Sequence, residues 1–334
     1  MTKFIKNIFK LSTIALLIGS VADAPALAAP TTGANTSQFV AVSDNCLNGQ
    51  TVNTSPNGIN WTNRFAGTTA YLYGVAGNSA GLFVAVGQGP MLTSPDGINW
   101  NARPSASSNY VRAVTVSDAG QFVAVGNQSD IQSSPDGMNW LLRSAGNIYS
   151  NPLVGVTVNK AGLFAAVGQG NVVTSPDGIN WTKAFTPLTP SNQVRAIAVN
   201  NDGLFVSVGD MGTSNNGLIL ISSDGINWNL QPGLAANTNL YGIAVNGAGL
   251  FAAVGVRGII MTSTDGINWT ARTSNITNDL RGVTVNSDGL FVAVGANGVI
   301  LTSTDGVIWL QQDSSFTPCA LSGAGSIKTL DYRK

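Results

Sequence analysis

Three arginines occupy one equivalent position in a repeated segment of this chain, and their spacing suggests anion binding. Arg112, Arg195 and Arg281 each stand directly before a small residue, Ala or Gly, in similar apolar stretches. Guanidinium groups keep their charge and bind carboxylate, sulfate and phosphate groups through paired hydrogen bonds. If these stretches converge on a common axis, the three side chains form a cationic ring suited to an anionic ligand.

Two tyrosines stand at the same position in other repeats, so Tyr73 and Tyr241 are expected to flank the arginines. Arg257, in the loop after a neighbouring strand, completes the predicted set of ligand-binding residues. The same residues also fit a structural interpretation, in which each arginine reaches solvent or pairs with a loop aspartate such as Asp279. The tyrosines could likewise pack loops against the strands.

The chain contains no histidine and no glutamate, which restricts the catalysis it could perform. Histidine is the most frequent general acid or base, and zinc and iron sites usually need His or several Cys. We therefore expect no metal and no cofactor, and we favour a non-catalytic role. An inverting hydrolase would have to rely on aspartates, of which five are expected near the arginines: Asp44, Asp130, Asp210, Asp279 and Asp313.

The elements that position these residues come from a phrase that recurs seven times, reading SPDGINW at residues 94–100. Each copy ends at one of the seven tryptophans, at positions 61, 100, 140, 181, 228, 269 and 309. A period of about 40 residues with a Gly and Trp signature is typical of a four-stranded propeller blade. We therefore predict an all-β, seven-bladed propeller with four antiparallel strands per blade.

The sixth repeat shows the expected strands of one blade, at residues 240–245, 250–255, 259–262 and 267–270. The turn before each Trp contains Gly preceded by Asp, or by Asn in the first copy, and Pro stands before that residue in the first four copies. These residues favour a tight turn for separate conformational reasons. Each second strand carries one Phe, and these seven are predicted to be core residues: Phe39, Phe83, Phe122, Phe164, Phe205, Phe251 and Phe291. The turns within blades then share one face of the ring, and the longer loops share the other.

The phrase Ser-x-Asp-Gly-x-x-Trp resembles the Asp-box of BNR-type propellers, a group that includes sialidases and photosystem II assembly factors. The resemblance covers about residues 38–323, although the motif here is one residue shorter and Asn57 replaces Asp in the first copy. It implies a propeller but little about activity, because the Asp-box is a turn. Sialidases bind a sugar carboxylate with three arginines from different blades, and the arginine set here is similar in outline. Their retaining mechanism also needs a Glu that this chain lacks.

The ring must close between the two ends of the chain, because the first repeat begins with a second strand. We predict that residues 316–323 supply the missing inner strand of blade 1, since closure removes exposed sheet edges. Cys46 and Cys319 would then lie at neighbouring strand ends and form a disulfide in an oxidising compartment. The alternative is two unrelated thiols. The predicted propeller thus spans residues 38–323, after a linker at 29–37 and before a tail at 324–334.

Residues 1–28 have the features of a secretory signal peptide, with early lysines, a short apolar run and a small-x-small end at Ala26-Leu27-Ala28. We predict a secreted or periplasmic monomer. No other apolar stretch approaches the length of a membrane span, so no membrane insertion is expected. No basic excess exists to bind nucleic acid. The predicted function is non-catalytic binding of an acidic glycan or a protein partner on the loop face, and the alternative is a sialidase-like exo-glycosidase.

Overall fold

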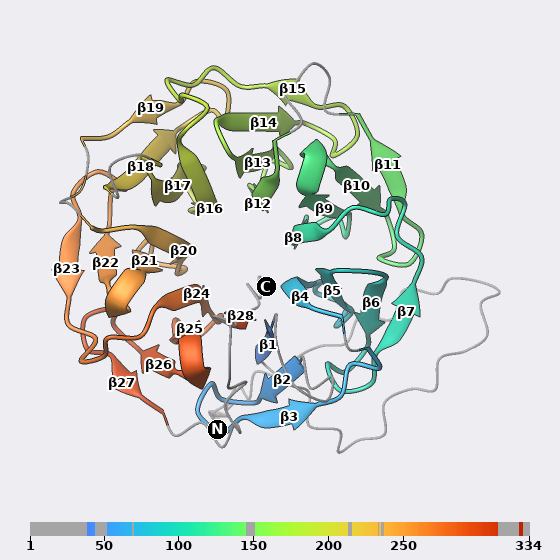
Figure 1. Ribbon diagram of the computed structural model, residues 1–334, viewed down its shortest axis with the longest axis horizontal. Helices are drawn as coiled ribbons and strands as arrows, with labels where there is room; N and C mark the ends of the chain where they lie inside the picture. Colours follow the sequence, from blue (N-terminus) through green and yellow to red (C-terminus); the bar gives the residue numbers. More distant parts are fainter. Residues whose placement is uncertain are drawn as a thin grey trace, which may run out of the picture. The chain divides into compact units, whose positions relative to one another are not determined.

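Seven four-stranded antiparallel sheets form a ring around a central axis (Figure 1). This computed structural model describes residues 39–43, 52–68, 70–144, 151–212, 216–232, 234, 237–312 and 327–329. The predicted all-β, seven-bladed propeller is confirmed. Within the described residues the helical segments are three short 3-10 turns: η2 (Asn127–Ser129), η3 (Val256–Gly258) and η4 (Ala296–Gly298).

The inner half of each blade consists of a strand beside the axis and a second strand paired with it. The inner strands, from blade 1 to blade 7, are β28 (Ile327–Thr329), β4 (Leu72–Gly77), β8 (Val111–Val116), β12 (Leu153–Val158), β16 (Gln193–Val199), β20 (Leu240–Val245) and β24 (Leu280–Val285). The second strands are β1 (Phe39–Ser43), β5 (Phe83–Gly87), β9 (Phe122–Gly126), β13 (Phe164–Gly168), β17 (Phe205–Asp210), β21 (Phe251–Gly255) and β25 (Phe291–Gly295).

The outer half of each blade consists of a third strand and a short outer strand. The third strands are β2 (Val52–Ser55), β6 (Met91–Ser94), β10 (Ile131–Ser134), β14 (Asn171–Ser175), β18 (Gly217–Ser222), β22 (Ile260–Ser263) and β26 (Ile300–Ser303). The outer strands are β3 (Thr62–Arg64), β7 (Asn101–Arg103), β11 (Leu141–Arg143), β15 (Thr182–Lys183), β19 (Asn229–Leu230), β23 (Thr270–Arg272) and β27 (Leu310–Gln311).

The core lies between blades, where the second strands are buried along their whole length. All seven predicted phenylalanines are buried, and five of them lie against the Trp of their own repeat, with ring centroids 6.0 to 6.4 Å apart. Continuous apolar strands suit this arrangement, because a neighbouring blade covers each face. The prediction of the core residues is confirmed.

The repeated turn acts as a structural corner, as blade 3 illustrates. One oxygen of Asp136, Oδ1, accepts the backbone N–H groups of Met138 and Asn139 at 2.8 and 2.9 Å. Gly137 adopts a φ of +73°, and its carbonyl oxygen accepts the Trp140 indole N–H at 3.0 Å. Burial raises the pKa of Asp136, but the hydrogen bonds from Asn139 and Met138 outweigh it and lower the pKa to about 2. The aspartate therefore stays ionised and holds the turn.

A C-terminal strand completes blade 1, as predicted, but it is not the predicted segment. β28 pairs with β1 in an antiparallel register that matches Ser43 with Ile327 and Ala41 with Thr329. These residues belong to the predicted tail rather than to residues 316–323. The physical reason is local: Ile327 and Thr329 are β-branched, whereas Pro318 in the predicted segment has no N–H to donate to a ladder. Cys46 and Cys319 lie outside the described residues, so the disulfide stays a prediction.

Six of the seven inner strands contain a β-bulge at the same place. In blade 3, Val111 pairs with Gly126 and Ala113 with Val125, which leaves Arg112 as the extra residue. A Cβ atom on Gly126 would collide with the carbonyl oxygen of Tyr110, so this close approach requires glycine. Blade 1 has Ser43 where the others have that glycine, and its pairing is regular. The bulges therefore set the direction of one side chain per inner strand.

Candidate ligand-binding site at the mouth of the central channel

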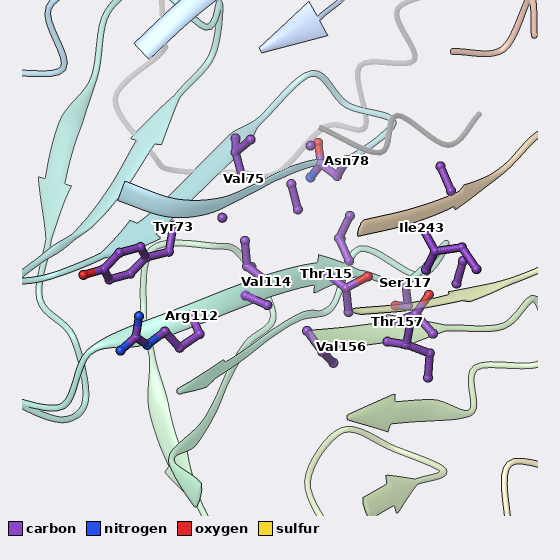
Figure 2. Close-up of a pocket in the computed structure, with 18 of the residues that line it drawn as sticks. Tyr73, Val75, Asn78, Arg112, Val114, Thr115, Ser117, Val156, Thr157 and Ile243 are labelled. Carbon is purple, nitrogen blue, oxygen red and sulfur yellow. The ribbon is translucent and has the colours of Figure 1, made fainter. Parts of the chain in front are cut away.

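A cavity of about 290 Å³ runs between the inner strands of the ring. Figure 2 shows Tyr73 and Arg112 together at one end of it, on the face that carries the longer loops. Val75 and Val114 lie next to them, and Ser117 lies at the other end, near the turns. The cavity therefore has a charged, aromatic mouth on the loop face.

The extra residues of the six bulges are the residues that the sequence placed at one equivalent position: Tyr73, Arg112, Val154, Arg195, Tyr241 and Arg281. The Arg112 guanidinium lies over the Tyr73 ring, 4.6 Å from its centroid. Tyr241 contacts two arginines, with Arg195 at 5.3 Å and Arg281 at 4.8 Å. The structure thus brings both tyrosines into contact with the arginines, in cation–π geometry.

The three arginines differ in their partners, and two of them form ion pairs. Arg195 Nε lies 2.7 Å from Asp210 Oδ2, and Arg281 Nη2 lies 3.1 Å from Asp279 Oδ2. The physical reason is that each aspartate sits next to the strand ends that form the bulge. The structural alternative, pairing with a loop aspartate such as Asp279, holds for these two residues.

A separation of fifteen residues links the extra residue of the bulge to a polar partner in three blades. In these three blades the residue after the bulge glycine contacts the extra residue: Arg195 donates to Asp210, Arg112 Nε donates to Asn127 Oδ1 at 2.9 Å, and the Gln88 amide donates to the Tyr73 hydroxyl at 2.6 Å. Asn127 is neutral where Asp210 is charged. Among the described residues, Arg112 is therefore the bulge arginine with no carboxylate partner.

Arg257 lies outside this ring of bulge residues. It occupies η3 with a φ of +51°, and its backbone N–H donates to Asp279 Oδ1 at 2.9 Å. Its Nη2 donates to the carbonyl oxygen of Asn237 at 3.1 Å. Arg257 thus bridges two loops on the exposed surface through its backbone and its side chain, and Asp279 links it indirectly to Arg281.

Asp130, one of the five aspartates considered for an inverting hydrolase, is buried and supports the loop before Arg112. Asp130 is 5% exposed, and its Oδ2 accepts hydrogen bonds from the Ser107 hydroxyl and from Gln132 Nε2. Its Oδ1 has no hydrogen-bond partner among the described residues. Burial raises the pKa of Asp130, although the hydrogen bonds from Ser107 and Gln132 oppose the rise. This cluster fixes residues 104–110, which lead directly into β8.

Neither Asn127 nor Gln88 was predicted as part of the site. The signal was present in the sequence, because both residues follow the glycine that ends a second strand. Assigning Asn127 to the site requires knowledge of the β-bulge, because regular strand pairing would not orient the Arg112 side chain toward Asn127. Two further candidate carboxylates, Asp44 and Asp313, lie outside the described residues.

Charge is divided between the two faces of the ring. Of the twelve aspartates in the described ranges, nine lie in turns within blades, on the face opposite Arg112. All eight described arginines lie at the loop-face end of a strand or in a loop there, and four of them are on outer strands: Arg64, Arg103, Arg143 and Arg272. Each of these four donates from Nε to a Thr or Ser hydroxyl of the third strand. The loop face is therefore basic and the turn face acidic.

Comparisons with known proteins agree on the fold. Residues 175–321 match the DUF6242 beta propeller domain. Virginiamycin B lyase from Staphylococcus aureus, in selenomethionine form, superposes with a TM-score of 0.64 at 14% identity, covering 84% of this chain and 90% of that chain. YCF48 from Cyanidioschyzon merolae gives a TM-score of 0.55 at 16% identity, covering 72% and 84%.

A structure of YCF48 bound to D1 peptide gives a TM-score of 0.58 at 18% identity, covering 75% of this chain and 85% of that chain. No curated protein gives a significant sequence match. Identities this low show a shared fold only. Within the described residues no helix is long and apolar enough to cross a membrane, and no cluster of three metal-ligating side chains occurs.

Proposed function

We propose that this propeller is a non-catalytic binding protein whose loop face receives a carboxylate group of a protein or glycan partner, with Arg112 as the anchor. One observation carries the proposal: Arg112 stands at the mouth of a cavity, and its hydrogen-bond partner Asn127 leaves its charge uncompensated. A carboxylate there would gain charge-assisted hydrogen bonds, which contribute about 1.5–3 kcal/mol each.

A protein partner is the favoured source of the carboxylate. The basic arginines on this face would attract an acidic surface and steer its approach. One solved structure of a similar propeller is that of YCF48 bound to D1 peptide, which supports a peptide-binding role here. We further propose that the repeat is a shortened Asp-box and that the mature chain is secreted or periplasmic.

A sialidase-like hydrolase is the weaker proposal. The described carboxylates near the mouth are already engaged: Asp210 pairs with Arg195, and Asp279 with Arg281. Asp130 is buried beneath a loop. A fluorogenic sialoside that is cleaved by the purified protein, with the cleavage lost in Arg112→Gln, would support this alternative instead.

The binding proposal is tested with two probes, a tetra-aspartate peptide and 3′-sialyllactose, titrated calorimetrically at low salt. Arg112→Gln should weaken binding of the preferred probe by about tenfold or more, because one charge-assisted contact is lost. Arg272→Gln is the matched control, since Arg272 lies on outer strand β23 and donates to Thr262 of the third strand, away from the channel. If neither probe binds, or if both variants weaken binding equally, the proposed site is wrong.

A further inference from the structure

The cavity below Arg112 is lined by aliphatic side chains from six blades. They occupy the second position after the extra residue of each bulge: Val75, Val114, Val156, Ile197, Ile243 and Val283. Five of these six are buried, and the open space that they face is the cavity itself. We refer to these six residues as the aliphatic layer. Because they converge from around the ring, a group on the axis would contact apolar surface on several sides.

The aliphatic layer lies close to the charged mouth. A strand rises about 3.3 Å per residue, so Val114 lies about 7 Å beyond Arg112 along β8. Figure 2 shows Arg112 and Tyr73 side by side, with Val75 and Val114 next to them along the channel. A carboxylate held by Arg112 would therefore direct whatever is attached to it toward the layer.

The far end of the cavity is polar and carries a negative charge. Asn78, Ser117 and Asp118 line it, at the turns between inner and second strands. Six residues separate Arg112 from Asp118, or about 20 Å of strand. A ligand with one carboxylate and an apolar tail matches this order of surfaces. A second carboxylate at the far end of the cavity would meet the Asp118 side chain.

We propose that the channel binds a free medium-chain fatty acid, with the carboxylate on Arg112 and the alkyl chain in the aliphatic layer. The proposal rests on the Arg112 carboxylate site proposed above, and it gives that site a second kind of ligand, a free acid small enough to enter the channel. The cavity volume of about 290 Å³ is near the lower end of ordinary small-molecule sites, which span roughly 300–1,000 Å³. The ligand therefore has to be small, and the polar far end limits the length of its tail.

The test is calorimetric titration with acetate, hexanoate, octanoate, octanol and octanedioate, all below their micelle-forming concentrations. Affinity should rise about fourfold for each added methylene from hexanoate to octanoate, because each buried CH₂ contributes about 0.8 kcal/mol on leaving water. Octanol, which has no charge for Arg112, and octanedioate, whose second carboxylate would be placed against the aliphatic layer, should each bind at least tenfold more weakly than octanoate.

Two variants separate the head group from the tail. Arg112→Gln should weaken hexanoate and octanoate by the same factor, about tenfold, and keep the gain per methylene. The double variant Val114→Thr with Val156→Thr should reduce that gain to less than twofold, because hydroxyl groups replace methyl groups at nearly constant volume. Melting temperatures of all variants show whether each is folded, and Arg272→Gln should bind like the parent chain.

The outcomes distinguish this proposal from the one it rests on. If carboxylates bind through Arg112 but affinity does not depend on chain length, the fatty-acid proposal is overturned while the carboxylate site stands. If Arg112→Gln changes the affinity of no acid, both proposals fail. Octanol binding as tightly as octanoate would also overturn the fatty-acid proposal, because the mouth would then make no contribution.

Discussion

Replacing Asn127 with aspartate should weaken carboxylate binding at the proposed site while every arginine stays in place. The structure contains the expected result in blade 5, where Arg195 Nε lies 2.7 Å from Asp210 Oδ2. In blade 3 the equivalent distance, from Arg112 Nε to Asn127 Oδ1, is 2.9 Å. Asp and Asn have the same shape, so Asn127→Asp should reproduce the Arg195 ion pair with no change in the backbone.

The size of the effect follows from the exposure of the pair. Two unit charges 4 Å apart interact by about 1 kcal/mol in water and about 4 kcal/mol at an effective dielectric constant of 20. The side chain of Arg195 is 41% exposed and that of Asp210 is 6% exposed, so an intermediate value of about 1–2 kcal/mol is appropriate. A ligand carboxylate would have to compete with this pairing. We therefore expect Asn127→Asp to weaken octanoate or tetra-aspartate binding by about tenfold.

The reciprocal variant supplies the matched control. Asp210→Asn should release Arg195 from its ion pair and give it the same neutral partner that Arg112 has now. Anion binding should then strengthen, or a second equivalent of ligand should bind. Asn127→Asp removes one positive unit of net charge and Asp210→Asn adds one, so a change in total charge alone could alter anion binding. Asp288→Asn adds the same unit of charge on the turn face, far from the mouth, and shows how large that general effect is.

Calorimetric titration at low salt, repeated at 0.5 M NaCl, measures both variants. The reasoning is refuted if Asn127→Asp binds the probe as tightly as the parent chain, or if Asp288→Asn strengthens binding as much as Asp210→Asn does. Either result would mean that the fifteen-residue pairing does not control the charge available at the mouth.

Three further predictions concern the scaffold. Gly126→Ala should lower stability by at least about 3 kcal/mol in a denaturant titration, because its Cβ would collide with the Tyr110 carbonyl oxygen, whereas Gly120→Ala meets no atom within 4 Å and should cost only the strain of its φ of +86°. The ionised Asp136 stabilises the folded parent chain at pH values above the unfolded-state pKa of this aspartate, and this stabilisation is lost as pH falls toward the folded-state pKa of about 2. Asp136→Asn should remove this contribution, which solvent exposure limits to about 1 kcal/mol. Chemical denaturation between pH 2 and 7 measures the difference. Asp130→Asn should raise the melting temperature at pH 7 and leave it unchanged near pH 3. The pKa of Asp130 is higher in the folded chain than in the unfolded chain, so its ionisation destabilises the fold as pH rises past the unfolded-state pKa. An equal fall in melting temperature at both pH values would contradict this.

The fold could be predicted because one physical signal repeats. Each Trp follows a tight turn that leads into an outer strand. The Ser and Asp of that turn form the same hydrogen bond, from the Ser hydroxyl to Asp Oδ1, in successive blades. The closing strand has no such signal. Ile327–Thr329 is only three residues long and has no corner of its own, so pairing with β1 could not be recognised from the repeat.

The site could be predicted only in part, for a related reason. Arg112, Arg195 and Arg281 occupy equivalent positions along their strands, and alignment of the repeats is enough to group them. Their ion pairs depend instead on aspartates that occupy different places in the two blades. Asp210 lies in β17, whereas Asp279 precedes β24 in a different loop, so no single spacing links both aspartates to their arginines.

The division of charge between the two faces gives the ring a permanent dipole along its axis, although the whole chain has a formal net charge of zero. Such a molecule should be retained by both cation and anion exchangers, presenting opposite ends to each. Arginine does not titrate in the working range, and hydrogen bonds hold the pKa of corner aspartates such as Asp177 and Asp224 below the normal value. The retention should therefore change little between pH 5 and 8, where histidine would normally respond. Near a charged surface the ring would arrive already oriented, loop face toward negative charge.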